Sequence, residues 1–147
     1  MTSVMGNVRL IDVPRFTDSR GSLSVIEAGE TCPFQIRRVF TICGCRRDDV
    51  RGRHANRYSQ FFMYCPTGQC DVKVVDLDSK ESLFHLDSPN VALYVPSMTW
   101  KEMSSFSEDC ILLIASDTHY DKSEYIYGLA EFLSMQALGD DNQRTEA

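Results

Sequence analysis

A short polar segment carries the side chains best suited to chemistry. Residues 51–60 read RGRHANRYSQ, and the one imidazole among them belongs to His54. Imidazole titrates near neutral pH, so His54 can accept and return a proton at physiological pH. Two neutral amides, those of Asn56 and Gln60, follow on the same segment. They are suited to orienting a hydroxyl or carbonyl group of a substrate.

The spacing of this segment resembles the first metal-binding motif of cupin barrels, His-x-His-x3-Glu. Asn56 stands at the second His and Gln60 at the carboxylate. The second cupin motif, Pro-x-Gly-x-x-His, corresponds to residues 96–101, where Lys101 replaces the His. One imidazole with two amides is a poor ligand set for a divalent metal, and a protonated Lys repels one. We therefore expect no metal and no other cofactor.

Lys101 gives the pocket a second chemical function. An ammonium group near a reacting carbonyl stabilises the oxyanion that develops during enolisation. It also lowers the pKa of a neighbouring imidazole by charge repulsion, which keeps the imidazole free to act as a base. The candidate catalytic set is therefore His54, Lys101 and Asn56. Abstraction of a proton next to a ketone is the chemistry that this set favours.

Most of the chain is predicted to form short strands that would position these side chains. Apolar or alternating runs separated by turn residues are typical of strands. The predicted strands cover residues 22–27, 35–43, 60–65, 70–77, 81–86, 91–95 and 110–116. Seven short strands at regular spacing favour an all-β sandwich or barrel of the jelly-roll type.

The C-terminal part has a helical pattern instead. Asp121 and Glu124 have the spacing of a capping box, and apolar residues then recur at helical intervals. We expect one amphipathic helix over residues 122–138. A single domain would span residues 1–139, and residues 140–147 would form a disordered polar tail.

Composition limits the class of protein. The 147 residues carry a net charge of −6 and no basic run, which argues against a nucleic-acid partner. No apolar run approaches about 18 residues, so we expect no membrane span. The six cysteines lack a zinc-ribbon spacing, and a chain of this length does not need disulfides for stability. Reduced thiols and a cytoplasmic location are therefore predicted.

Ordered motifs along the chain resemble those of one enzyme family, the nucleotide-sugar 3,4-ketoisomerases that act on dTDP-4-keto-6-deoxyglucose. The resemblance extends from about Asp18 to Phe132. The motifs are DSRGSL at 18–23, PFQIRRV at 33–39, RGRHA at 51–55, LDSP at 86–89, YVP at 94–96, WKEM at 100–103, FS at 106–107, YD at 120–121 and YI at 125–126.

The resemblance implies a metal-free cupin jelly roll that forms a homodimer by exchanging N-terminal strands. It implies that a dTDP-linked 4-keto-6-deoxy sugar is converted to its 3-keto isomer through an enediol, with His54 as the base. The product would serve the synthesis of amino sugars for O-antigen or other polysaccharides. The residues it places at the substrate are Arg20, Arg38, Arg51, Gln60, Tyr94, Trp100 and Glu102.

Three departures from the family pattern leave alternatives open. Members usually carry a second His where this chain has Asn56, often a Tyr near Phe40 and Thr41, and often His or Arg where it has Lys101. Loss of a general acid or base costs roughly 10²–10⁴-fold in rate. The alternatives are a sugar-nucleotide-binding cupin without activity and a related epimerase or isomerase that uses the same pocket.

Overall fold

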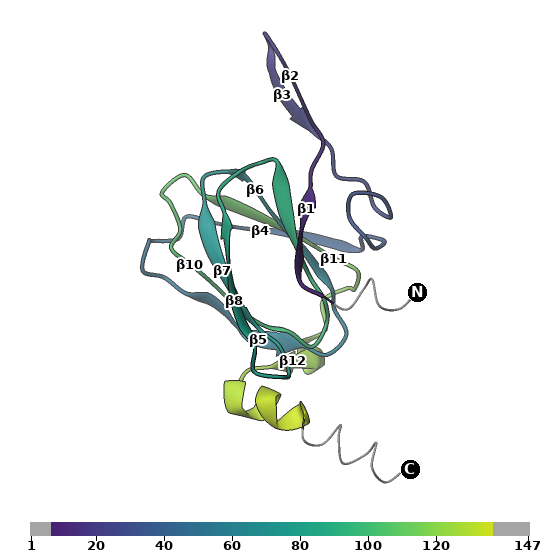
Figure 1. Cartoon of the computed structure of the whole chain (residues 1–147), viewed down its shortest axis with the longest axis vertical. Coiled ribbons are helices and arrows are strands. Elements are labelled where there is room, and N and C mark those ends of the chain that lie inside the picture. The colour runs from purple at the N-terminus through teal and green to yellow at the C-terminus, as the bar shows by residue number, and fades with distance from the viewer. Residues whose placement is uncertain (1–6, 137–147) are drawn as a thin grey trace.

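The computed structural model describes residues 7–136, and this part of the chain is mostly β-sheet. Two five-stranded antiparallel sheets face one another (Figure 1). In spatial order, the first contains β1 (Arg9–Asp12), β9 (Val91–Val95), β6 (Phe61–Thr67), β11 (Ile111–Ser116) and β4 (Arg38–Cys43). The second contains β12 (Tyr125–Ile126), β5 (Arg51–Asn56), β10 (Trp100–Ser104), β7 (Cys70–Val75) and β8 (Glu81–Leu86). The predicted β-rich class is confirmed.

The main core lies between the two sheets. Side chains alternate along a strand, so one set from each sheet points inward. Phe61 and Met63 of β6 meet Val72 and Met103 of the opposite sheet in one buried cluster. The other face of the first sheet supports a second cluster around Tyr94, which the segment before β4 covers. Strand parity therefore decides whether a residue reaches the space between the sheets.

A hairpin near the N-terminus stands apart from this core. Strands β2 (Arg15–Asp18) and β3 (Gly21–Ser24) pair only with each other and extend beyond the sheets (Figure 1). Phe16 and Leu23 face each other across the hairpin and remain 64% and 60% exposed. Two large apolar side chains at such exposure form a surface typical of contact with another protein.

The C-terminal helix starts later than the sequence pattern predicted. The capping residue Asp121 begins only a 3-10 turn, η2 (Lys122–Glu124), and β12 follows directly. Tyr125 and Ile126 pair with β5, and the α-helix starts at Leu129. The prediction is wrong for residues 122–128 because sheet pairing and burial of Ile126 outweigh the helical periodicity. The helix end and the polar tail lie outside the described residues.

Five strands were missing from the sequence prediction: β1, β2, β5, β10 and β12. Strand β5 is rich in arginine, and β10 mixes charged and apolar residues, so neither has the β-branched composition of a typical strand. Both acquire their strand structure from pairing with neighbours inside the sheet. These two strands carry His54 and Lys101.

The six cysteines are free thiols in the structure. Three of them, Cys65, Cys70 and Cys110, lie together in the main core, with sulfur–sulfur distances of 3.7 and 3.9 Å from Cys65 to the other two. Burial raises the pKa of the Cys110 thiol to about 12, which favours the neutral form. Neutral thiols of this kind behave as small apolar core residues.

Gly68 provides a stability test of the turn between β6 and β7. Its φ is +73°, and an added Cβ would lie 2.5 Å from the Cys110 Cα. Gly44 has the same φ and open space around it. The positive φ costs an alanine about 1–2 kcal/mol at either position. We expect Gly68→Ala to lower the free energy of unfolding, measured by urea titration, by at least about 1 kcal/mol more than Gly44→Ala does. Equal losses would contradict the backbone clash.

Candidate active site

A cavity of about 230 Å³ lies between the two sheets and contains the polar residues of interest. Apolar side chains form about half of its wall, so a substrate group inside would be partly shielded from water. Its basic side chains are those of Arg51, His54 and Lys101, and Thr41 adds a hydroxyl group. The apolar lining includes Phe40, Ile42, Phe61, Met63, Met103 and Ile114, and Tyr125 closes one side.

A β-bulge in β5 brings two of these polar residues to the same wall. Lys101 pairs with His54 while Met103 pairs with Arg51, so three residues of β10 span four of β5. The extra residue is Arg53, which has a φ of 58°. In a regular strand, Arg51 and His54 would point to opposite faces. The neighbouring Gly52 permits the distortion, because a Cβ there would lie 2.9 Å from the Lys101 carbonyl oxygen.

His54 is held as a neutral imidazole. Burial and the nearby Lys101 ammonium lower the pKa of His54 to about 4. Its ring centroid lies 4.7 Å from that of Tyr125, and its buried Nδ1 has no hydrogen-bond partner among the described residues. A neutral imidazole with an unengaged nitrogen can accept a proton without first losing one.

Lys101 is buried on the wall beside it, with 3% of its surface exposed. The Nζ donates a hydrogen bond of 2.8 Å to the Asn56 Oδ1 and lies 4.5 Å from the centre of the Phe61 ring. Burial is the main reason that the pKa of Lys101 falls to about 7; the Glu124 charge partly offsets the effect of burial, and the Arg38 charge adds to it. Near neutral pH, Lys101 can therefore both donate and accept a proton.

Glu124 holds the end of the pocket in place, a role that the sequence had not indicated. Its carboxylate accepts hydrogen bonds from the backbone N–H groups of Tyr58 and Ser59 and from the Ser59 hydroxyl. Burial alone would raise the pKa of Glu124, but these hydrogen bonds outweigh it and hold the pKa below its usual value. The Asp121-x-x-Glu124 spacing had pointed to a helix cap, and the side chain instead fixes the turn after Asn56.

Arginines supply positive charge near the cavity. Arg51 lines it directly. Arg38 contributes to lowering the pKa of Lys101, and its buried Nε and Nη2 have no hydrogen-bond acceptor among the described residues. Buried donors without an acceptor are costly, so their presence favours binding of an anionic group at this position.

Gln60 and Tyr94 lie on the other face of the first sheet. The Gln60 amide and backbone N–H donate to the two oxygens of Asp117 at 2.8 Å, and its carbonyl accepts from the Tyr94 hydroxyl. Tyr94 is fully buried against Phe34. The structure does not bring either side chain to the cavity that contains His54.

Trp100 and Glu102 likewise point away from the cavity, because they alternate with Lys101 and Met103 along β10. The Trp100 Nε1 donates to Glu102 at 2.9 Å, and its ring packs against Phe132 of the C-terminal helix. Glu102 faces Lys73 at 3.5 Å. These two side chains support the wall of the pocket from behind.

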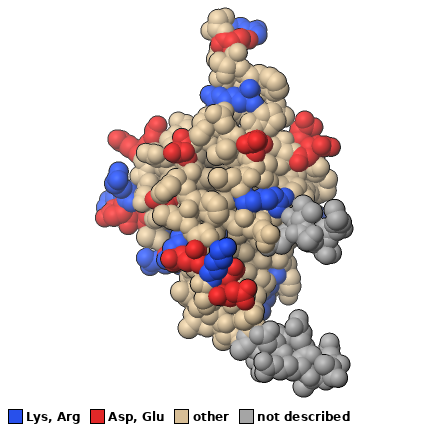
Figure 2. Space-filling model, viewed as in Figure 1, with Lys and Arg blue, Asp and Glu red and all other residues tan. Residues whose placement is uncertain are grey.

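Arg20 lies at the tip of the projecting hairpin, where it forms an exposed ion pair of 2.6 Å with Asp18. Figure 1 shows that the hairpin extends away from the two sheets, so Arg20 does not reach the pocket of its own chain. On the face in Figure 2, charges of both signs are dispersed over the surface.

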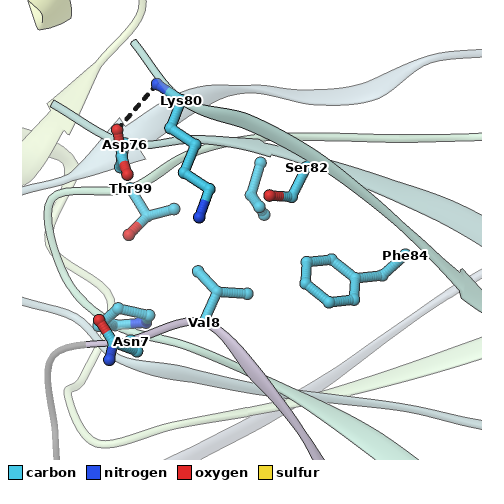
Figure 3. Close-up of a pocket in the computed structure, with 9 residues that line it drawn as sticks. Asn7, Val8, Asp76, Lys80, Ser82, Phe84 and Thr99 are labelled. Atoms are coloured by element: carbon cyan, nitrogen blue, oxygen red, sulfur yellow. Dashed lines mark hydrogen bonds between the residues drawn. The ribbon is translucent and has the colours of Figure 1, made fainter. Parts of the chain in front are cut away.

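A second cavity, of about 360 Å³, lies between the segment that precedes β1 and strands β7 and β8 (Figure 3). Lys80, Ser82 and Thr99 line it, together with the apolar Val8 and Phe84. Its carboxylate, Asp76, accepts backbone hydrogen bonds from Asp78 and Lys80, both 2.9 Å, which close the turn after β7. No imidazole lines this cavity among the described residues, so we place proton-transfer chemistry in the pocket of His54.

Three of the four positions that correspond to cupin metal ligands come together, and the fourth does not. His54, Asn56 and Lys101 come together, but Gln60 faces the opposite side of the sheet. Within residues 7–136, the thiols of Cys65, Cys70 and Cys110 are the metal-ligating groups that cluster, and they lie in the core instead. The same part of the chain contains no helix long and apolar enough to cross a membrane.

Comparison with known proteins gives a consistent result. A family model described as FdtA: WxcM-like, C-terminal, matches residues 6–137. A protein of Aneurinibacillus thermoaerophilus named TDP-4-oxo-6-deoxy-alpha-D-glucose-3,4-oxoisomerase is 36% identical over 118 residues, which are 80% of this chain and 84% of that protein. The chain is thus similar to an enzyme over most of its length.

Solved structures extend the similarity to the fold. A His-to-Asn mutant of the 3,4-ketoisomerase QdtA from Thermoanaerobacterium thermosaccharolyticum, in complex with TDP-4-keto-6-deoxyglucose, matches with a TM-score of 0.85 and 30% identity, covering 89% of this chain and 94% of that one. The TDP-fucose-3,4-ketoisomerase WlaRA from Campylobacter jejuni matches with a TM-score of 0.82 and 33% identity, covering 88% and 96%.

Replacement of Lys101 tests the cost of its burial. Lys101→Met should raise the free energy of unfolding at pH 6 by about 1 kcal/mol or more, since apolar residues often stabilise such sites. Lys101 loses its proton near pH 7 when folded and near 10.5 when unfolded, so the stability of the unmodified protein rises with pH between these values. The advantage of the variant should therefore shrink from pH 7 to 9.

Chemical denaturation at several pH values measures this effect. Lys80→Met is the matched control, because Lys80 is exposed and should give no comparable pH dependence. A constant difference between Lys101→Met and the unmodified protein across this pH range would contradict the buried, perturbed lysine.

Proposed function

The chain belongs to the FdtA family, and we propose that it is a 3,4-ketoisomerase acting on a dTDP-linked 4-keto-6-deoxy sugar. The proposal is supported by relatives named as TDP-sugar 3,4-ketoisomerases. The observation that carries it is the neutral His54 imidazole beside Lys101 in one apolar pocket. TDP in those names is thymidine diphosphate, which is also abbreviated dTDP.

We also infer that the fold is a cupin jelly roll and that the reaction needs no metal. Two facing five-stranded antiparallel sheets support the first inference. The donor set of the pocket supports the second, because an ammonium group and an amide accompany the single imidazole. We assign residues 1–139 to one domain and place the enzyme in the cytoplasm, where its product would enter polysaccharide synthesis.

His54 begins the proposed reaction as a base. It removes the proton on C3 of the sugar, and the electron pair of that bond forms a C3=C4 double bond. The C4 carbonyl oxygen takes a proton from the Lys101 ammonium, which gives an enediol. The apolar surroundings strengthen the attraction between the ammonium group and the developing oxyanion.

The second half reverses these roles. The C3 hydroxyl loses its proton to the Lys101 amine as the C3 carbonyl forms, and the His54 imidazolium returns its proton to C4. Each group ends in its starting state, and the sugar has only moved its ketone. Family members usually have a second titratable group, a His, at the position of Asn56. In this chain Lys101 takes over that role. Asn56 holds the ammonium group in position through its 2.8 Å hydrogen bond.

The arginines suit the diphosphate of such a substrate. A guanidinium group binds phosphate oxygens through parallel N–H donors and keeps its charge at all relevant pH values. Arg38 has two buried donor atoms without acceptors within residues 7–136, and Arg51 lines the pocket. We assign both to the diphosphate and its attached sugar.

We propose further that two chains form a homodimer by exchanging their N-terminal strands. The projecting hairpin supports this, because Phe16 and Leu23 are exposed and Arg20 lies far from its own pocket. Exchange would bury the apolar pair and bring Arg20 to the substrate bound by the partner. An unpaired edge of this kind readily pairs with another chain.

Deuterium exchange tests the reaction. The protein incubated in D₂O with dTDP-4-keto-6-deoxyglucose should place deuterium at C3 or C4 and yield the 3-keto isomer, followed by NMR. His54→Asn should slow this exchange about 10²–10⁴-fold, because it removes the base. Binding of dTDP to the variant, measured by calorimetry, serves as the control for an intact fold.

Three outcomes would count against the proposal. Full deuterium exchange in His54→Asn would contradict the assignment of His54 as the base. No exchange in the unmodified protein, with normal dTDP binding, would favour a sugar-nucleotide-binding protein without activity. Incorporation without a 3-keto product would point to a related epimerase.

Mixed dimers test whether Arg20 acts in the partner's pocket. Arg20→Ala and His54→Asn should each be nearly inactive alone. Mixed after gentle unfolding and refolding, they should form heterodimers in which one pocket has both residues. We expect about a quarter of the normal activity, since half of the dimers would be mixed and half of their pockets complete. Activity no higher than that of the separate variants would contradict exchange.

A further inference from the structure

An exposed tyrosine lies next to the pocket and has no role in the chemistry above. Tyr120 is 64% exposed, on the segment that leads from β11 to η2. Its ring centroid is 5.9 Å from that of Tyr125, which in turn lies 4.7 Å from His54. A line of aromatic rings therefore leads from the imidazole to the protein surface.

Arg38 lies beside the same line. Its guanidinium carbon is 5.8 Å from the Tyr120 ring centre, and two of its buried nitrogen atoms lack acceptors in the described part of the chain. The anion-binding group is thus near the outer ring, while the proton-transfer groups occupy the inner end. This order matches a nucleotide sugar, in which the diphosphate separates the sugar from the nucleoside.

We propose that Tyr120 is the stacking surface for the thymine base of the substrate. The inference rests on the proposed function, because it takes the sugar to occupy the pocket of His54. The diphosphate then lies at Arg38, and the deoxyribose carries the base outward onto the exposed ring. Aromatic side chains bind nucleobases well because every base offers a flat π-face.

Two other exposed tyrosines fit this role less well. Tyr127 is 62% exposed, but its ring stacks on Tyr125 at 5.8 Å and lies 6.2 Å from His54, at the sugar end. Tyr58 is 66% exposed, and no aromatic ring or guanidinium group contacts its ring among the described residues. Tyr120 combines exposure with the neighbouring arginine.

Calorimetry with dTDP tests the assignment. Tyr120→Leu should weaken dTDP binding about tenfold, which corresponds to about 1.4 kcal/mol. Tyr120→Phe should bind dTDP normally, because it keeps the ring and loses only the hydroxyl. Tyr58→Leu is the matched control, with similar exposure outside the line of rings, and should also bind normally. Inorganic pyrophosphate should bind equally to all of these proteins.

An NMR measurement separates stacking from an indirect effect. The thymine methyl signal of bound dTDP should shift upfield under the ring current of Tyr120. The shift should persist in Tyr120→Phe and disappear in Tyr120→Leu. Unchanged dTDP affinity in Tyr120→Leu would overturn the inference, and so would an equal loss of pyrophosphate binding. Both results are independent of turnover, so a failure here is distinguishable from a failure of the isomerase proposal.

Discussion

The burial of Lys101 next to His54 is the constraint on which the site depends. His54 and Lys101 can each carry a positive charge, and they share one cavity. Burial there lowers the pKa of both groups and so disfavours their charged forms. The imidazole responds by remaining neutral, and the lysine by titrating near pH 7. A strongly hydrated pair would have neither property. The proton-transfer capacity of the pocket therefore follows from the burial of these two groups.

Several features of the fold maintain this arrangement. The bulge at Arg53 puts Arg51 and His54 on one wall, and pairing of β5 with β10 places Lys101 opposite His54. Glu124 fixes the turn after Asn56. Its negative charge partly offsets the lowering of the Lys101 pKa that burial causes. Each of these contacts comes from a different part of the chain, so the site forms only when the sheets have assembled.

The sequence predicted which residues lie together better than it predicted the face of the sheet that each side chain occupies. The cupin-like spacing correctly brought His54, Asn56 and Lys101 into one cluster, since both motifs lie on paired strands. Motif membership alone could not reveal strand parity, which turns Gln60 away from the cavity. The role of Glu124 was hidden for a similar reason. Its local pattern fits a helix cap, and the contact with Ser59 joins residues 65 positions apart.

Because strands form the walls of the pocket, its inner part can move little. Its walls are residues of hydrogen-bonded ladders rather than of loops, and local opening of ladder strands usually costs nearly as much free energy as global unfolding. The spacing between His54 and Lys101 should therefore be nearly as durable as the sheet itself. Substitutions at the exposed rim of the pocket would then be the main way to accept sugars of other shapes. The spacing between the two inner residues would stay the same.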